Sequence, residues 1–428
     1  MNITQDLQTP PIFDGDFSVK QSKFFGSDPL GFIIEGQKQH GDIYYAFIGV
    51  RRTIVVNKPE YLKEIWSSNK FDLGPANEIF KKILGNGLGT VNGEVWTMHN
   101  KLSRTDFTPK KMLLYLDTMQ DSMTAFLDDL AVNSQSSKID MVHALKRMVL
   151  ISSFKVYDYN ASTSEVDLII DLYDNFLDDI IAKIRNPFSK EVRKEAEKTY
   201  EEIRPAFNKL IDDVIAVSSF PTVKRYQDQN IDHELLRDQM ASIVITGYGS
   251  VVYAIDSILI WMSTSQKVLN DVKSEINEQF HQPVDVFQLK KLMNAVNEGL
   301  RLSPPAWMVY RTALEDTTIG PYNVPKGTEV LLSLYGANHH LDHWSEPFEY
   351  NPDRFNDYGP NELKDIFMPF GAGRRACLGT NMAMQEILLF IAILFKNYEV
   401  EFLPGREEGL VAKLSVMFKK HYISLKKK

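Results

Sequence analysis

The segment from Phe367 to Ala383 constrains this chain more than any other. It reads FMPFGAGRRACLGTNMA and contains Cys377, the single cysteine among 428 residues. Glycines let a backbone adopt positive φ and approach a ligand closely, and neighbouring cations favour the thiolate that binds metals. We therefore expect a loop wrapped under a flat ligand with Cys377 as a metal ligand, the alternative being a buried, inert cysteine. The glycines and arginines around the thiol are Gly371, Gly373, Arg374, Arg375 and Gly379.

This loop resembles the haem-ligand loop of the cytochrome P-450 family. The resemblance implies that Cys377 is the proximal iron ligand and that Arg375 pairs with a haem propionate. It also implies haem b and dioxygen as cofactors, with electrons ultimately from NAD(P)H. Gly371 is expected to lie against the haem with the rest of the loop. The family pattern F-x-x-G-x-R-x-C-x-G is met by Phe370, Gly373, Arg375, Cys377 and Gly379.

Composition and charge narrow the class of protein. The formal net charge is −8, which argues against nucleic acid or an anionic membrane as a partner of the whole molecule. One cysteine excludes an intrachain disulfide framework and suits a reducing compartment. Residues Met1 to Lys23 are polar, so we expect no signal peptide or membrane anchor. The expectation is a cytoplasmic monomer with a single domain over residues 1–428.

The residue pattern along the chain predicts mostly helix. Gly41 to Val56 holds two β-rich runs around a turn and predicts a hairpin, and Pro59 opens a helix. Apolar spacing predicts helices over Asp117 to Ser218 and one long buried helix over Asp232 to Thr264. Closing strands are expected over Tyr398 to Leu425. The prediction is a mainly α fold with small β-sheets, and the resemblance implies a haem between the long distal helix and the Cys377 loop.

Two further segments resemble haem-propionate sites of the family. The family often has Trp-x-x-x-Arg at the start of a helix, and Trp96 matches while the arginine position holds Asn100. An amide donates only a neutral hydrogen bond, so we expect His99 or Lys101 to supply the missing charge. Arg311 matches another propionate-binding arginine. The plainer alternative for Trp96 is a core aromatic residue.

The centre of the long helix departs from the family pattern. Gly247 matches the glycine that makes room for dioxygen, and Ser250 falls on the threonine that relays protons. Gly249 falls on the position of the acid that resupplies them. Three possibilities stay open: solvent or a substrate group completes the relay, hydrogen peroxide is the oxidant, or the enzyme abstracts hydrogen and couples or desaturates its substrate. Ser250 could also simply bond a carbonyl of its own helix.

A charged network is expected behind the Cys377 loop. Glu298 and Arg301 stand three residues apart on one helix face and are followed by Leu-x-Pro-Pro. Arg354 lies in Pro-x-Arg-Phe. The resemblance implies that these three residues form a structural Glu–Arg–Arg network, which we do not consider catalytic.

The substrate and the redox partner are predicted only in outline. We expect Tyr248, Trp307, Met308 and Val309 to line a substrate pocket. The leading function is hydroxylation of an apolar small molecule in secondary metabolism. Coupling or desaturation of an aromatic substrate is the alternative, motivated by Gly249 and the aromatic residues, and a haem sensor or carrier without turnover is the other class.

A locally basic stretch predicts the docking site of a ferredoxin-type electron carrier. Four of its five cations follow Trp96, and the fifth belongs to the Cys377 loop. The alternative is an ordinary solvated face. The expected patch consists of Lys101, Arg104, Lys110, Lys111 and Arg374.

Overall fold

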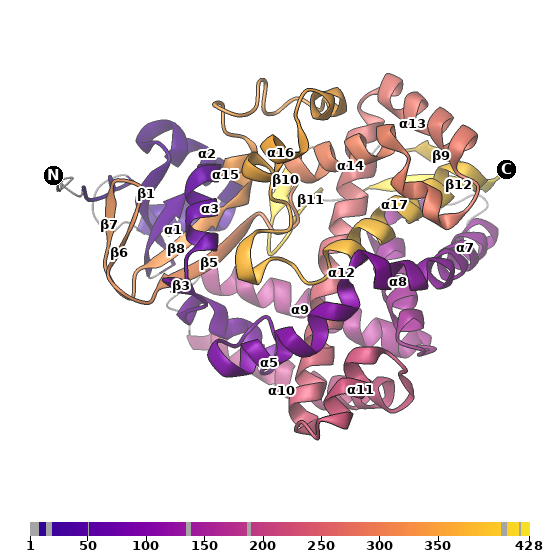
Figure 1. Cartoon of the computed structure of the whole chain (residues 1–428), viewed down its shortest axis with the longest axis horizontal. Helices are drawn as coiled ribbons and strands as arrows, with labels where there is room; N and C mark the ends of the chain where they lie inside the picture. The colour runs from indigo at the N-terminus through magenta and orange to yellow at the C-terminus, as the bar shows by residue number, and fades with distance from the viewer. Residues whose placement is uncertain are drawn as a thin grey trace.

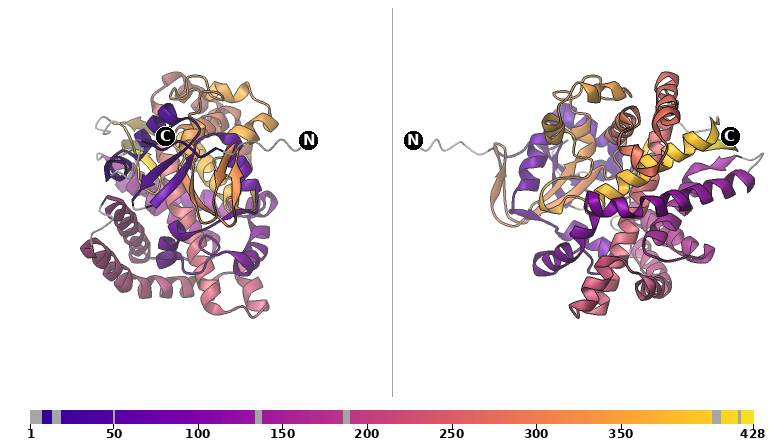
Figure 2. Two further views of the ribbon diagram at one scale, coloured as in Figure 1. Left: turned by 90° about the vertical axis from the view of Figure 1, so that its left-hand side faces the viewer. Right: turned by 45° about the vertical axis from the view of Figure 1, so that its right-hand side comes forward.

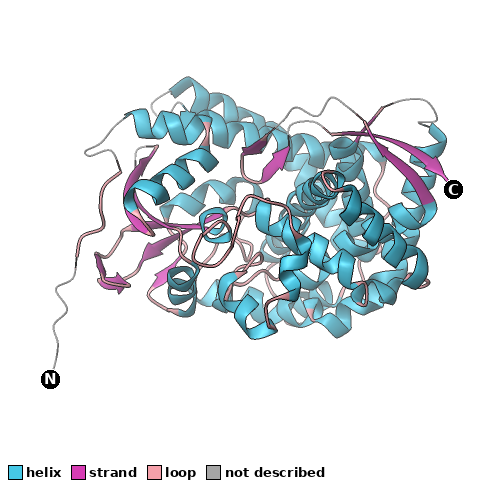
Figure 3. Cartoon of the chain, turned by 90° about the horizontal axis from the view of Figure 1, so that it is seen from above, coloured by secondary structure: helices cyan, strands magenta, loops and turns pink. Residues whose placement is uncertain are grey.

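The computed structural model describes residues 8–13, 19–49, 51–133, 138–185, 190–403, 409–418 and 421–428. Helices make up most of the described chain, the large sheet lies on the side of the amino terminus, β9 and β12 lie near the carboxyl terminus, and β10 and β11 lie between them (Figures 1 and 3). The predicted class, mainly α with small sheets, is confirmed.

The largest sheet has the strand order β1-β2-β8-β5-β3. Its first two strands form the predicted antiparallel hairpin, and β2 pairs in parallel with β8. The edge strand β3 is short and covers only the Thr312–Ala313 end of β5. Residues Met308 to Arg311 therefore lie on an edge that no described strand covers. The bounds are β1 Ile43–Ile48, β2 Arg51–Val56, β3 Phe71–Asp72, β5 Met308–Ala313 and β8 Glu329–Ser333.

Three smaller sheets complete the described strands, with orders β4-β12-β9, β6-β7 and β10-β11. The closing strands predicted near the carboxyl end are present. The bounds are β4 Ile139–Asp140, β6 Thr317–Ile319, β7 Tyr322–Val324, β9 Tyr398–Phe402, β10 Leu410–Ala412, β11 Val416–Phe418 and β12 Tyr422–Lys427.

The helical body is built around α12 (His233–Ser263), which matches the predicted long helix. It packs against α8 (Met141–Val156), α10 (Lys190–Val217), α14 (Lys290–Leu302) and α17 (Thr380–Asn397) (Figures 1 and 2). Among the described helices, α12 alone has the length and apolar composition to cross a membrane, but 78% of its apolar window is buried inside the protein. Its apolar side chains thus form core.

The remaining helices surround this body and the large sheet. The α-helices are α1 Val19–Ser27, α2 Pro29–His40, α3 Pro59–Ser67, α4 Lys81–Leu84, α5 Gly93–Ser103, α6 Pro109–Met112, α7 Leu116–Asn133, α9 Thr163–Arg185, α11 Pro221–Asp228, α13 Gln266–Gln279, α15 Leu334–Asn338 and α16 Pro360–Ile366. The 3-10 helices are η1 Pro75–Phe80, η2 Arg104–Phe107, η3 Leu113–Tyr115, η4 Pro283–Phe287, η5 Pro352–Asn356 and η6 Gly373–Arg375.

Candidate active site

A cavity of about 910 Å³ lies between α12, the Cys377 loop and the uncovered edge of β5. Its wall is mostly apolar, with additional residues from η1, α4, α5 and α9. This volume is near the upper end of the range for ligand pockets, so it has room for a large cofactor together with a small molecule. Cys377 and Ser250 both line it.

The Cys377 loop has the backbone geometry that its glycines predict. Gly371 and Gly373 have φ of 68° and 70°. A β-carbon at position 373 would also lie 2.1 Å from the carbonyl oxygen of Trp66, so a side chain is excluded there. The Cys377 N–H donates to the carbonyl of Phe370 at 2.9 Å and closes the loop. This geometry directs the thiol into the cavity.

Two details of the loop differ from expectation. Gly379 has φ of −86° and a β-carbon there would meet nothing within 4 Å, so neither backbone nor space requires glycine. Phe370 packs against the main hydrophobic core and does not line the cavity. The protein atoms packed around the Cys377 thiol raise its pKa, although the residue has surface open to the cavity, while the Gly379 N–H, the Thr380 hydroxyl and Arg104 act in the opposite direction. Since the thiolate is the ligand, metal binding would release a proton here.

Four arginines of the cavity wall lie beside the Cys377 loop, and we call them the arginine rim: Arg104, Arg311, Arg374 and Arg375. Arg375 pairs with Asp72 at 2.5 Å between Nε and Oδ1, and Arg374 pairs with the same carboxylate. Arg311 is 9% exposed, and its guanidinium donates to the neighbouring carbonyl of Tyr310 at 2.7 Å. Burial, Arg375 and Arg374 lower the pKa of Arg311 to about 10, which leaves it charged at neutral pH. The rim therefore has a cationic excess that suits an anionic ligand.

The charge missing at Asn100 is supplied by Arg104, the first residue of η2, which follows α5 directly. Asn100 and Arg104 both line the cavity, and Arg104 Nε donates to Asn100 Oδ1 at 2.8 Å. Arg104 also donates to the carbonyl of Arg374 at 3.3 Å. It stands four residues beyond Asn100, one helical turn further along, and this spacing was the signal that could have found it.

The two residues expected to supply that charge do not. His99 is fully buried, bonds Tyr226 Oη and the carbonyl of Asn86, and does not line the cavity. Burial lowers its pKa to about 4, so it is neutral at physiological pH. Lys101 is exposed and lies outside the cavity wall. Trp96 does line the cavity, with the guanidinium carbons of Arg374 and Arg375 at 5.3 and 5.0 Å from its ring.

One face of α12 presents hydroxyl groups to the cavity. Ser250 lines it, and its Oγ donates to the carbonyl of Thr246 at 3.1 Å. Ser250 thus makes the helix hydrogen bond that was the plainer expectation while also facing the cavity. Thr246 lines the same wall and donates to the carbonyl of Ser242 at 2.7 Å. The sequence interpretation missed Thr246, although it lies four residues before Ser250 on the same helix face.

The glycine at position 249 accommodates a protein side chain. A β-carbon at Gly249 would lie 2.0 Å from Tyr173 Oη, and Tyr173 from α9 lines the cavity. Tyr173 therefore occupies the space that a side chain at position 249 would need. Tyr248 packs edge-on against Tyr173, with ring centroids 5.1 Å apart, and does not line the cavity. A β-carbon at Gly247 would meet nothing within 4 Å.

The β5 wall is only partly as predicted. Met308 and Val309 line the cavity, together with Tyr310 and Arg311, because this edge of the strand is uncovered. Trp307 does not: it is buried, and its indole N–H donates to the carbonyl of Lys413 at 2.9 Å. Its assignment to the substrate pocket is wrong.

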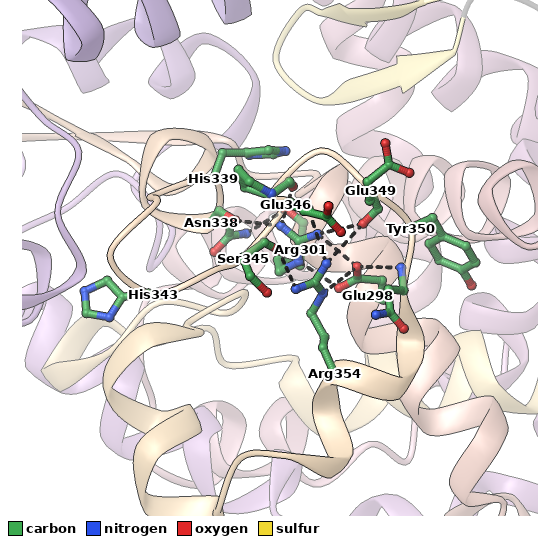
Figure 4. A network of polar contacts seen from close by, with 12 residues as sticks. Glu298, Arg301, Asn338, His339, His343, Ser345, Glu346, Glu349, Tyr350 and Arg354 are labelled. Carbon is green, nitrogen blue, oxygen red and sulfur yellow. Dashed lines mark hydrogen bonds and ion pairs between the residues drawn. The ribbon is translucent and has the colours of Figure 1, made fainter.

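Glu298, Arg301 and Arg354 form the predicted network (Figure 4). Arg301 donates to both oxygens of Glu298 at 2.7 and 2.9 Å, and Arg354 Nε donates to Oε1 at 2.9 Å. Backbone carbonyls accept most of the remaining guanidinium hydrogens. The Asn338 carbonyl accepts from Arg301, and the Ser345 carbonyl accepts from Arg354. The network is buried and lies outside the cavity wall.

A family model described as cytochrome P-450 matches residues 18–162 and 153–426, which is nearly the whole chain. The chain belongs to the cytochrome P-450 family. It is 21% identical over 398 residues to cyclooctat-9-en-7-ol 5-monooxygenase of Streptomyces melanosporofaciens, covering 88% of this chain and 86% of that protein. It is 25% identical over 447 residues to steroid 17-alpha-hydroxylase/17,20 lyase of Ictalurus punctatus, covering 94% of this chain and 85% of that protein. Similarity to protein LUTEIN DEFICIENT 5 of Arabidopsis thaliana is 22% identity over 412 residues, covering 86% and 68%.

The residues present fit the haem that this cytochrome P-450 family implies. The Cys377 thiol and the Trp96 ring line a large cavity, and Asp72 pairs with two of the four arginines beside the Cys377 loop. A group with two carboxylates would satisfy the buried Arg311, which donates a hydrogen bond to a backbone carbonyl. The chain is thus a haem-thiolate oxidoreductase of the monooxygenase type.

Proposed function

We propose that this enzyme hydroxylates an apolar small molecule with dioxygen, in secondary metabolism, using electrons from a ferredoxin-type partner. The observation that carries the proposal is the single apolar cavity wall shared by Cys377 and by the hydroxyls of Thr246 and Ser250. Two of the relatives are named as a monooxygenase and a hydroxylase, which supports the reaction class.

Each group of residues has a distinct part in this proposal. Haem bound to a thiolate supplies dioxygen activation. Cys377 would provide the sulfur ligand, while Arg104, Arg311, Arg374 and Arg375 would hold the propionates. The apolar wall binds the substrate and excludes water from the site.

The α12 hydroxyls that line the cavity would deliver protons during the reaction. Ser250 Oγ already donates to Thr246 O, so its lone pairs remain free to accept a hydrogen bond from a water in the cavity. Position 249 has no carboxylate, and Tyr173 occupies the space beside it. We therefore propose that solvent or a substrate group resupplies protons to Ser250, and that hydrogen peroxide is the alternative oxidant.

Aromatic coupling is a weaker alternative in this structure. Two aromatic residues that the sequence places in the pocket, Tyr248 and Trp307, do not line the cavity, whereas Tyr310 does. Tyr173 adds a second phenol to the wall, but the neighbouring surface from η1 and α4 is mainly aliphatic.

The redox partner would dock on a smaller patch than the sequence predicts. Arg104 and Arg374 belong to the cavity rim, and Arg374 is paired with Asp72. Lys101, Lys110 and Lys111 are exposed and form the remaining candidates. Their charge would attract an acidic electron carrier with a salt-dependent rate.

The proposal is tested on haem-loaded protein with ferredoxin, its reductase and a panel of terpenoids, steroids and fatty acids. We expect substrate-dependent NAD(P)H consumption and one labelled oxygen atom from labelled dioxygen in the product. Cys377→Ser is expected to abolish both and to remove the thiolate signature of the ferrous carbonyl spectrum. Turnover that requires hydrogen peroxide and ignores ferredoxin would replace the electron-transfer part of the proposal. Desaturated or coupled products without labelled oxygen would overturn hydroxylation.

A further inference from the structure

A polar cluster interrupts the otherwise apolar wall at the large sheet. Arg51 and Thr53 on β2, and Glu329 on β8, all line the cavity. Thr53 and Glu329 are aligned partners in the parallel β2–β8 pair, so they are neighbours across the two strands. We call these three residues the sheet cluster. It belongs to the same cavity as Cys377 and shares no residue with the arginine rim, although Arg311 of the rim lies on the neighbouring strand β5, one register position from Glu329.

Two oxygen atoms of the sheet cluster are buried and have no hydrogen-bond partner. Thr53 is 0% exposed and its Oγ1 is unpartnered. Glu329 is 7% exposed and its Oε2 is unpartnered. An unsatisfied buried polar atom destabilises the fold, so two such atoms on adjacent strands of a cavity wall are unusual in a folded protein.

The other oxygen of the Glu329 carboxylate, Oε1, already has two partners. It pairs with Arg51 and accepts the N–H of Ala76 at 3.1 Å. These contacts fix the side chain and neutralise its charge without reaching Oε2. Because the Arg51 cation is already paired, an anionic substrate group would meet Oε2 without a compensating free charge.

We propose that the sheet cluster is a subsite for the hydroxyl group of an apolar alcohol substrate. A hydroxyl is complementary to both free atoms, because it can donate to Glu329 Oε2 and accept from the Thr53 hydroxyl. The apolar remainder of the cavity would bury the hydrocarbon part. This inference rests on the proposed function, since it names the substrate class of that same cavity.

The test uses haem-loaded enzyme and matched ligand pairs, each an alcohol and its methyl ether: dodecan-1-ol, a sesquiterpene alcohol and a sterol. Dodecanoic acid is the anionic probe. Dissociation constants are read from the spin-state change of the ferric haem, which requires no turnover. The variants are Thr53→Val and Glu329→Gln. The control is Thr312→Val, which makes the same change on β5 beside Glu329, at a residue outside the cavity wall.

We expect at least one alcohol to bind roughly tenfold or more tightly than its ether, the effect of a hydrogen bond to a charged group. Thr53→Val and Glu329→Gln should reduce that ratio, and Thr312→Val should leave it unchanged. Equal binding within every pair, or no binding of any alcohol, would overturn the subsite. Tightest binding of dodecanoic acid, lost in Arg51→Met, would overturn it in favour of an anion site. Loss of the thiolate spectrum in the wild-type enzyme would instead be a failure of the proposed function.

Discussion

The Glu298 network and the arginine rim both place guanidinium groups inside the protein, yet they are satisfied in opposite ways. Glu298 accepts from Arg301 and Arg354, and backbone carbonyls take most of their remaining hydrogens. At the rim, Asp72 pairs with both Arg374 and Arg375, while Arg311 donates to a backbone carbonyl of its own strand and forms no ion pair within the described residues.

This difference separates scaffold from ligand site without reference to sequence motifs. A network that balances its own charge needs no further group and stabilises the fold. A buried cation without an acid partner costs free energy unless a ligand supplies the charge. The rim is therefore the place where an anionic ligand contributes to stability, and the network is not.

The largest expected effect on stability comes from removing the carboxylate of the Glu298 network, whose charges are balanced. Glu298→Ala would leave Arg301 and Arg354 buried without a carboxylate, and we expect a loss of about 3–5 kcal/mol in the free energy of unfolding. Denaturant titration of the protein without haem measures it. The matched control is Glu349→Ala, whose exposed side chain is removed while its carbonyl still accepts from Arg301. Equal stability of the two variants would remove the basis for calling the network a scaffold.

Glu386 sharpens the comparison, because it is a buried acid on α17 that forms no ion pair within the described part of the chain. It is 2% exposed, and its Oε1 accepts from the Ser153 hydroxyl at 3.4 Å. Burial raises its pKa from 4.5 to about 8. The folded state therefore binds more protons than the unfolded state between these values, and stability falls as pH rises through this window.

Glu386→Gln should remove that loss. We expect the variant to gain stability over the wild type by up to about 1.4 kcal/mol per pH unit between pH 5 and 8, with little difference below pH 4. Thermal unfolding at a series of pH values measures the difference in stability between the variant and the wild type. The control is Glu399→Gln, which makes the same change at an exposed site. A difference that does not change with pH would show that Glu386 is ionised in the fold.

The unbalanced region should respond in the opposite sense to the network. Arg311→Met removes a buried cation, so the haem-free protein should keep or gain stability, while haem affinity falls roughly tenfold. Haem transfer to a scavenger protein and unfolding of the haem-free form measure the two effects separately. Arg52→Met, an exposed arginine on β2, is the control. Loss of stability without haem would place Arg311 with the scaffold.

The smallest effect is expected at Arg104. Because this side chain is exposed, Arg104→Leu should weaken haem binding only about two- to fivefold. Lys101→Leu, three residues earlier in α5 and outside the cavity, should have no effect on haem binding. An equal loss in both variants would mean that the general positive charge of this stretch matters and that Arg104 makes no specific contact.

Sequence reasoning found contiguous features and missed those made between segments. The Cys377 loop, the β1–β2 hairpin, α12 and the Glu298 network each have a local pattern of glycines, strand residues, apolar spacing or paired charges, and all are present. Asp72 lies in a two-residue strand far from the Cys377 loop in sequence, so nothing local connects it with Arg374 and Arg375.

The incorrect site assignments have the same cause. His99 and Trp307 stand beside residues that line the cavity, but adjacent positions on a helix or strand point in different directions. Gly249 falls on the acid position of the family pattern, and the space beside it is filled by the side chain of Tyr173 from α9. Such packing depends on residues about eighty positions away, and no single-sequence pattern records it.

The sequence by itself determined the helical fold, the thiol that faces the cavity and the charged network, because each depends on residue types at fixed local spacing. Only the tertiary structure decided which arginines surround the cavity, which aromatic residues line it, and where Thr53 and Glu329 meet. Charge balance and burial are properties of the space between segments, and that space exists only once the chain has folded.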